Sequence, residues 1–198
     1  MTERSAGRVI AGSARGLRLV APASAARPLG DRLKEALFAI LEPEIRGQAV
    51  LDLFAGSGAG GIEALSRGAG RVVFVDRDAD AIAAITRNLQ ATHLASSGAI
   101  VRAEVSAWLR GDGRRAGPFG VILVDPPYDD PALGDAALRE IALAGPGSLL
   151  VAAGVVVAKH PRRIAPGPRI GLLASVRERQ FGESGLTFLR WQADEEAG

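Results

Sequence analysis

The sequence predicts an α/β fold in which a largely parallel sheet ends in an antiparallel hairpin. Three observations support this prediction. Short apolar runs alternate with helical patterns after residue 48, a glycine-rich turn follows the first of these runs, and the last two apolar runs flank a short connection that contains glycine. Strands that alternate with helices are typical of a parallel sheet covered by helices.

A hairpin and a helix are predicted ahead of the sheet. Two apolar runs lie on either side of Gly12, so residues 8–20 are expected to form a small β-hairpin. In residues 31–41 the apolar side chains recur at three- and four-residue spacing, which indicates an amphipathic helix. We expect Asp31 to cap this helix and Pro43 to end it.

The rest of the chain supplies the strands and helices of the expected sheet. The apolar runs that predict strands are 49–54, 72–76, 99–101, 120–125 and 148–159. Helical spacing is found in 61–69, 78–94, 106–111 and 131–145. Residues 111–120 are expected to form a polar loop, whereas 169–180 and 186–191 flank the sequence FGESG and predict the terminal hairpin.

Composition excludes several classes of protein and site. No apolar run reaches the roughly 18 residues of a membrane helix, and the N-terminus lacks the apolar core of a signal peptide, so we expect a cytoplasmic protein. The absence of cysteine excludes disulfides, thiolate zinc sites and cysteine nucleophiles. Because His93 and His160 are the only histidines and lie far apart in the sequence, no metal site is expected.

Charge is unevenly distributed although the net charge is only +2. Residues 1–34 carry seven basic side chains against Glu3 and Asp31, and a second basic run covers 159–179. Such patches suit phosphates, although a solvated basic surface is the alternative. The basic residues of the first run are Arg4, Arg8, Arg15, Arg18, Arg27, Arg32 and Lys34.

The glycine turn after residues 49–54 indicates a nucleotide-containing cofactor. Gly56, Gly58 and Gly61 have the G-x-G-x-x-G spacing of dinucleotide-binding proteins, and Asp76 lies where a ribose-binding acid is expected. Asp52, just before the turn, would repel a pyrophosphate but attract an ammonium group. S-adenosylmethionine carries that ammonium and NAD does not. The alternative is a tight turn that only packs a strand against a helix.

The sequence DPPY at 125–128 indicates chemistry on a nucleobase. It follows an apolar strand and is therefore expected at the carboxyl edge of the sheet, where α/β folds bind ligands. Pro126 and Pro127 fix the chain and lack N–H donors. Asp125 and the Pro126 carbonyl can accept the two N–H groups of an exocyclic amine while Tyr128 stacks on the ring. Together with the glycine turn, this motif predicts methyl transfer to the amino group of a base; a purely structural Asp-Pro-Pro turn is the alternative.

These motifs resemble those of bacterial methyltransferases that modify the N2 amino group of a guanine in small-subunit (16S) ribosomal RNA. The resemblance covers nearly the whole chain, through RVIAG (8–12), DRLKEALFAIL (31–41), VLDLFAGSGAGGIEALSRGA (50–69), VDPPY (124–128) and FGESGL (181–186). It implies a class I methyltransferase fold, Rossmann-like and seven-stranded, at 31–198, preceded by an RNA-binding hairpin extension at 1–30. It also implies S-adenosylmethionine as cofactor, 16S RNA within a ribosomal particle as substrate, and a monomer.

The resemblance also assigns residues to roles. Residues that correspond to the methionine-side cofactor loop are Asp52, Phe54, Ala55, Gly56, Ser57 and Gly58. Asp76 and Arg77 correspond to the ribose contacts, and Glu104 and Val105 to the adenine contacts. Residues 125–128 correspond to the base clamp, and the basic residues of 1–34 to RNA contacts. This chain departs from related sequences at Leu29, at Gly60 and at Glu104.

Three alternatives remain at this point. An adenine N6-methyltransferase acting on DNA or RNA would use the same four-residue clamp. An NAD-dependent oxidoreductase would need a nicotinamide site that DPPY does not supply. An RNA-binding ribosome assembly factor without activity would bind ribosomes and transfer no methyl group.

Overall fold

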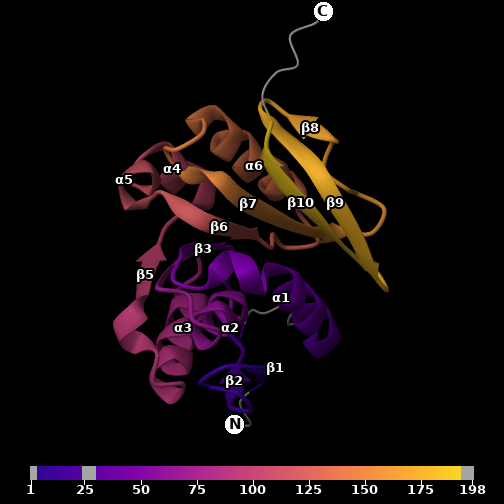
Figure 1. Cartoon of the computed structure of the whole chain (residues 1–198). Helices are drawn as coiled ribbons and strands as arrows, with labels where there is room; N and C mark the ends of the chain where they lie inside the picture. Colours follow the sequence, from indigo (N-terminus) through magenta and orange to yellow (C-terminus); the bar gives the residue numbers. More distant parts are fainter. Residues whose placement is uncertain (1–3, 24–29, 193–198) are drawn as a thin grey trace, which may run out of the picture. The chain divides into compact units, whose positions relative to one another are not determined.

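The computed structural model describes residues 4–23 and 30–192 of the chain and consists of two compact units, Met1–Val105 and Ser106–Gly198. Each unit combines helices with strands of an α/β fold (Figure 1). The hairpin at the N-terminus belongs to the first unit. The predicted division between an RNA-binding extension at 1–30 and a methyltransferase domain at 31–198 does not coincide with the two units and stays a prediction.

The first unit begins with the expected hairpin, whose strands β1 (Ser5–Arg8) and β2 (Arg18–Val20) are antiparallel. Helix α1 (Asp31–Ile45) follows, and two predictions about its ends are wrong. Gly30 is the N-cap, and Pro43 lies inside the helix. Near a helix end proline removes only one hydrogen bond, and Ile45 beyond it is fully buried, so packing maintains the last turn.

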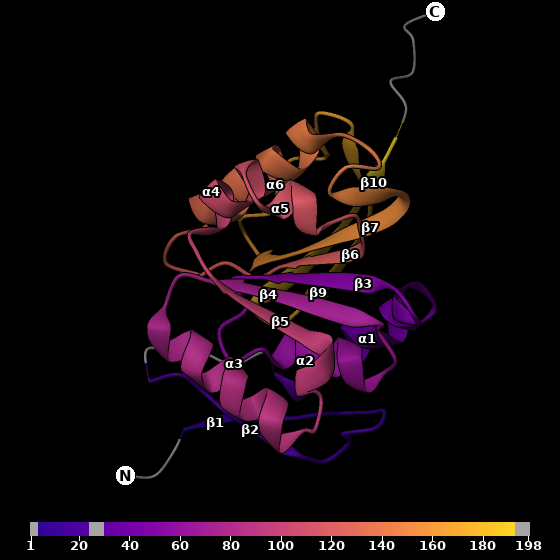
Figure 2. The ribbon, with the colours of Figure 1, turned by 90° about the vertical axis from the view of Figure 1, so that its left-hand side faces the viewer.

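The sheet of the first unit is parallel, with strand order β5-β4-β3. Its strands are β3 (Ala49–Leu53), β4 (Arg71–Asp76) and β5 (Gly98–Arg102). The connecting segments form α2 (Ala59–Ser66), α3 (Ala79–Ala91) and the short 3-10 helix η1 (Ala95–Ser97). Figure 2 shows α2 and α3 between these strands and the hairpin, so that the hairpin forms a further layer outside the helices.

Buried polar side chains of α2 and α3 hold the hairpin. Two backbone N–H groups that follow β1 donate to the carboxylate of Glu63 (2.8 and 3.1 Å), and a third donates to Ser66 Oγ (2.9 Å). Asn88 pairs with both backbone groups of Val20 at 2.9 Å. Glu63 is fully buried and its charge is balanced by Arg67 Nε at 2.8 Å. These contacts satisfy donors that a free hairpin would expose to water.

The second unit contains strands in the order β6-β7-β10-β9-β8. Strands β6 (Phe119–Val124) and β7 (Leu150–Pro161) are parallel, and β7, β10 (Ser184–Trp191), β9 (Leu173–Phe181) and β8 (Arg169–Ile170) pair antiparallel in turn. The helices are α4 (Val105–Arg110), α5 (Gly113–Ala116) and α6 (Ala132–Ala144), and Figures 1 and 2 both show α6 against one face of β6 and β7.

The predicted terminal hairpin is confirmed, with a shorter connection than expected. Its connection is only Gly182 and Glu183, because residue 181 still belongs to β9 and residue 184 already belongs to β10. Gly182 has φ +57°, a value that favours glycine in a two-residue turn.

Two other elements differ from the prediction. The polar loop predicted at 111–120 contains the short helix α5, and the two-residue strand β8 adds to the seven expected strands.

Candidate active site

The turn between β3 and α2 has a backbone shape that explains its glycines. Phe54, Gly56 and Gly58 have φ values of +58°, +55° and +76°. A Cβ at Gly56 would meet no atom closer than 3.9 Å, so this side of the turn is an open cradle. A Cβ at Gly61 would lie 2.3 Å from the ring of Phe74, so the third glycine of the pattern serves helix packing.

Two carboxylates, those of Asp52 and Asp76, accept hydrogen bonds from backbone N–H groups in and next to this turn. Asp52 is buried on β3, and its Oδ2 accepts a hydrogen bond from the Gly61 N–H at 2.8 Å. Asp76 ends β4, and its two oxygens accept the N–H groups of Gly56 (2.8 Å) and Asp78 (3.0 Å). A carboxylate has about four lone-pair sites, so Asp76 retains acceptor capacity for hydroxyl groups. The open cradle beside two carboxylates fits a cofactor that carries an ammonium group and a ribose.

The remaining predicted cofactor residues lie around the same strand ends, and their contact with a cofactor stays a prediction. Ser57 is held by Asn88, whose Nδ2 donates to the Ser57 carbonyl at 2.8 Å. Arg77 is exposed and its carbonyl accepts a hydrogen bond from Arg102 Nε at 3.3 Å. Glu104 is exposed and Val105 is buried. Ala55 is also buried and its carbonyl accepts the N–H of Gly58. Asn88 could not be recognised from the sequence, because its partners are distant in the chain.

The DPPY motif of the second unit is shaped by its neighbours. Asp125 is the first residue after β6. Pro126 packs against α6 so closely that a Cβ on Gly134 would lie 2.8 Å from Pro126 Cγ. The Asp130 N–H donates to the Pro127 carbonyl at 3.2 Å and closes the turn that follows. The motif is therefore held between the end of β6 and helix α6, which comes close to Pro126 because Gly134 has no side chain.

Lys159 contacts the two side chains of the motif that are predicted to bind the base. Its Nζ lies 2.6 Å from Asp125 Oδ1 and 4.7 Å from the centroid of the Tyr128 ring. Burial raises the pKa of Asp125, and the Lys159 ammonium opposes this shift through its charge and its hydrogen bond. In the sequence, Lys159 stands out only as part of a basic run. Its position follows from the parallel pairing of β6 with β7, where Val124 stands opposite Ala158.

Tyr128 is partly exposed and is tied to the terminal hairpin. The residue is 38% exposed, so part of it remains accessible to a ligand. Its hydroxyl shares a hydrogen bond with Ser184 Oγ at the start of β10. Ser184 was not predicted as a site residue, although it belongs to the FGESG sequence that resembles the family.

The predicted RNA-binding residues divide into exposed and buried groups. The side chains that are exposed are Arg4, Arg8, Arg15, Arg18 and Arg32. Arg8 also pairs with Asp31 at 3.2 Å. The prediction that Lys34 contacts RNA is wrong, because this side chain is fully buried and its ammonium donates to the Arg8 carbonyl. Burial also lowers the pKa of Lys34. Arg27, like Leu29, lies outside the described residues.

Within the described ranges, no cluster of three or more histidine, cysteine, aspartate or glutamate side chains could hold a metal ion. In the same ranges, none of the helices combines the length and apolar character needed to cross a bilayer.

The comparisons with known proteins decide the family. The model of a family described as "Conserved hypothetical protein 95" matches residues 7–190. The chain belongs to this family. The "Putative rRNA methyltransferase YlbH" of Bacillus subtilis is 36% identical to it over 92% of this chain and 98% of that protein. The family resemblance found in the sequence is thereby confirmed.

Two further relatives agree with this assignment. The "Ribosomal RNA small subunit methyltransferase D" of Haemophilus influenzae is 40% identical over 61% of this chain and 63% of that protein, which is less than two thirds of its length. The solved structure of a hypothetical protein from Thermus thermophilus has a TM-score of 0.76 and 34% identity, and covers 92% of this chain and 98% of that one. The chain therefore has the expected class I methyltransferase fold.

Proposed function

We propose that this protein transfers a methyl group from S-adenosylmethionine to the exocyclic N2 amino group of a guanine in 16S ribosomal RNA of the small ribosomal subunit. The observation that carries the proposal is the contact of Lys159 in β7 with Asp125 and Tyr128, which follow β6. Family membership adds weight, because relatives are named as ribosomal RNA methyltransferases.

The clamp supplies what an aromatic amine needs in order to act as a nucleophile. Asp125 Oδ1 is taken by Lys159, and among the described residues no other side chain is bonded to this carboxylate. Its Oδ2 is thus the oxygen proposed to accept an N–H of the target amine. The exposed ring of Tyr128 offers a stacking surface for the base.

The cofactor turn of the first unit is proposed to serve the same reaction. Bound S-adenosylmethionine would supply an electrophilic methyl group on a sulfonium. Asp52 favours the ammonium of its methionine part through opposite charge, and Asp76 accepts from its ribose hydroxyls. The negative charge at Asp52 makes the turn unsuitable for the pyrophosphate of NAD.

Asp125 is proposed to accept the proton that the target amine loses during the reaction. The nitrogen lone pair would form the new bond to the methyl carbon while the carbon–sulfur bond of the sulfonium breaks and its electron pair stays on sulfur, and the N–H proton that the nitrogen loses would pass to Asp125 Oδ2. This role requires the ionised carboxylate, which the Lys159 ammonium favours. Positioning of the amine against the methyl group supplies much of the rate.

Two substitutions test the division of roles. Asp125→Ala is expected to abolish methylation of small ribosomal subunits taken from a strain that lacks this protein, with the affinity for S-adenosylmethionine changed by less than about twofold. Asp76→Ala is expected to weaken cofactor binding about tenfold or more, because it removes hydrogen bonds to a charged group. Calorimetry measures binding, and methyl incorporation measures transfer.

The modified nucleoside decides the substrate. Digestion of the RNA followed by mass spectrometry is expected to give N2-methylguanosine. N6-methyladenosine would instead establish the adenine alternative, and subunit binding by the wild-type protein without incorporation would establish a non-enzymatic assembly factor. Equal loss of cofactor affinity in both variants would contradict the roles proposed for the two aspartates.

A further inference from the structure

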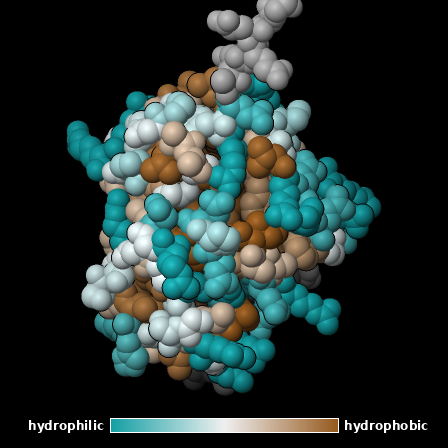
Figure 3. All heavy atoms as spheres, viewed as in Figure 1, coloured by the Kyte–Doolittle hydropathy of each residue, from teal (hydrophilic) through white to brown (hydrophobic). Residues whose placement is uncertain are grey.

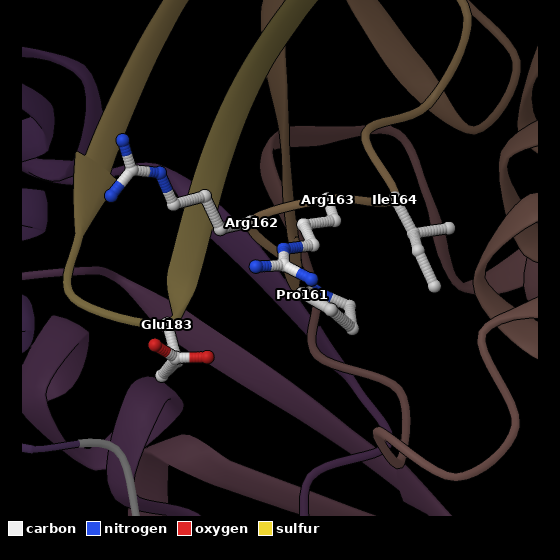
Figure 4. Close-up of a pocket in the computed structure, with 5 residues that line it drawn as sticks. All are labelled: Pro161, Arg162, Arg163, Ile164 and Glu183. Carbon is white, nitrogen blue, oxygen red and sulfur yellow. The ribbon is translucent and has the colours of Figure 1, made fainter.

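The end of β7 and the β9–β10 turn enclose a surface pocket that the proposed reaction does not use. Its volume is about 480 Å³, and it is lined by Pro161, Arg162, Arg163, Ile164 and Glu183. Figure 4 shows the Arg163 guanidinium beside Pro161, whereas the Arg162 side chain extends away from Arg163 on the side where Glu183 lies. We call this surface pocket the arginine pocket.

The arginine pocket is built by backbone pairing and is not a chance grouping of long side chains. Pro161 stands opposite Ser184 in the pairing of β7 with β10. The next N–H, that of Arg162, donates to the carbonyl of Glu183 at 2.8 Å. The hydrogen bond fixes the start of the Arg162 side chain next to the hairpin turn.

The charge of the arginine pocket is available for an anion. Arg162 and Arg163 are exposed, and neither guanidinium forms an ion pair with any residue in 4–23 or 30–192. Glu183 is the one acidic residue of the lining. Figure 3 shows hydrophilic residues gathered over this side of the unit, where β9 and the segment after β7 lie. Guanidinium groups match the geometry of phosphate oxygens.

The arginine pocket adjoins the base clamp through a continuous set of contacts. Ser184, which pairs with Pro161 of the pocket, shares a hydrogen bond with the hydroxyl of Tyr128. Tyr128 in turn packs against Lys159, the partner of Asp125. A ligand that stacks on Tyr128 and extends past Ser184 would place its next group at the arginines.

We propose that the arginine pocket binds a phosphodiester group of the RNA beside the target nucleotide. This inference rests on the proposed function, because it assigns the pocket to the same substrate. Contacts to phosphate fix the register of a nucleic acid and carry no sequence information. Arg162 and Arg163 therefore position the strand, while the clamp holds the base. Glu183 opposes the anion and limits the strength of this contact.

The test uses small ribosomal subunits from a strain that lacks this protein, and measures kcat and KM for the subunits at 50 and 200 mM salt. In the double variant Arg162→Ala and Arg163→Ala, KM is expected to rise at low salt, with kcat nearly unchanged. Loss of two phosphate contacts should make the ratio of the variant's KM to the wild-type KM about tenfold smaller at 200 mM than at 50 mM salt. Glu183→Gln is expected to change KM in the opposite direction and lower it.

A matched control removes two other exposed arginines of the same unit, Arg114→Ala and Arg139→Ala, and is expected to leave KM and its salt dependence close to wild type. Affinity for S-adenosylmethionine should be unchanged in all variants. Equal effects of the two double variants, or no effect of either, would overturn the arginine pocket as a phosphate site. Failure of the wild-type protein to methylate subunits would instead contradict the proposed function.

Discussion

Lys159 shows how one side chain can set the state of a whole site. Its ammonium bonds one oxygen of Asp125 and lies over the ring of Tyr128, so a single residue contacts both the proposed acceptor and the proposed stacking surface. Lys159 is 12% exposed, and a charge this well shielded from water is screened little by salt. It therefore acts on the charge of Asp125 more strongly than a surface lysine would.

Substitution of Lys159 should change how the reaction depends on pH. Protonation of Asp125 removes its acceptor, so wild-type activity is lost as the pH falls through the Asp125 pKa. In Lys159→Met the ammonium that lowers the Asp125 pKa is gone, so this pKa rises further and the acid limb of the activity profile moves to higher pH. Single-turnover methyl transfer measured across pH gives both profiles.

The conservative variant separates charge from structure in this experiment. Lys159→Arg keeps the positive charge and is expected to leave the acid limb near its wild-type position, even where the rate falls. If Lys159→Met kept the wild-type pH profile, Lys159 would have no influence on the ionisation of Asp125.

At the scale of elements, the hairpin is attached to α2 by a contact that only glycine permits. A Cβ at Gly12 would lie 1.8 Å from the Ser66 carbonyl oxygen, and this carbonyl accepts the next N–H, that of Ser13, at 2.8 Å. Gly16 has nearly the same backbone angle, with φ +85° against +84°, but has no atom within 4 Å of its added Cβ. The two glycines thus share a φ that would strain other residues, and they differ in packing.

This pair allows a controlled measurement of the contact with α2. Gly16→Ala is expected to reduce the free energy of unfolding by about 1–2 kcal/mol, the cost of a left-handed conformation. Gly12→Ala should cost at least about 1 kcal/mol more, because the loop must also leave its hydrogen bonds on α2. Urea denaturation of both variants gives the difference. Equal losses would mean that the close approach at Ser66 adds no stability.

Elements with strong periodicity could be predicted from the sequence, and contacts between distant elements could not. The strands and helices of both units follow the expected order, because their apolar spacing reflects burial. The end of α1 was mispredicted, since the burial of Ile45 outweighs Pro43. Lys159 and Asn88 escaped prediction because strand register and helix packing place them at the site. Lys34 was taken for a surface charge because spacing does not show that a backbone carbonyl holds its ammonium.

At the scale of the whole molecule, a net charge of +2 conceals local basic surfaces. The exposed arginines of the hairpin form one, and the arginine pocket lies in a second basic run of the sequence. A large RNA presents many phosphates, so each surface is proposed to contribute to affinity separately. Loss of charge on one surface should then reduce the salt dependence without removing binding.

The hairpin surface can be tested by removing three charges together. Arg8→Ala, Arg15→Ala and Arg18→Ala are expected to weaken binding to small ribosomal subunits and to flatten the log–log salt dependence by up to about three units. The control replaces three other exposed arginines, Arg46, Arg114 and Arg139, by alanine. Binding measured at several salt concentrations gives the slopes, and an unchanged slope would show that the hairpin charges only face solvent.

The anchoring of the hairpin by Glu63, Ser66 and Asn88 also limits whether this extension can be gained, lost or transferred without changes in α2 and α3. A segment whose backbone donors end on the side chains of another element is not an independent module. Removal of the extension would deprive the Glu63 carboxylate, which is fully buried in the intact protein, of two hydrogen-bond donors. Residues 63, 66 and 88 are therefore expected to change together with the hairpin among relatives, and a graft of the hairpin onto another methyltransferase should fail unless these three side chains are transferred with it.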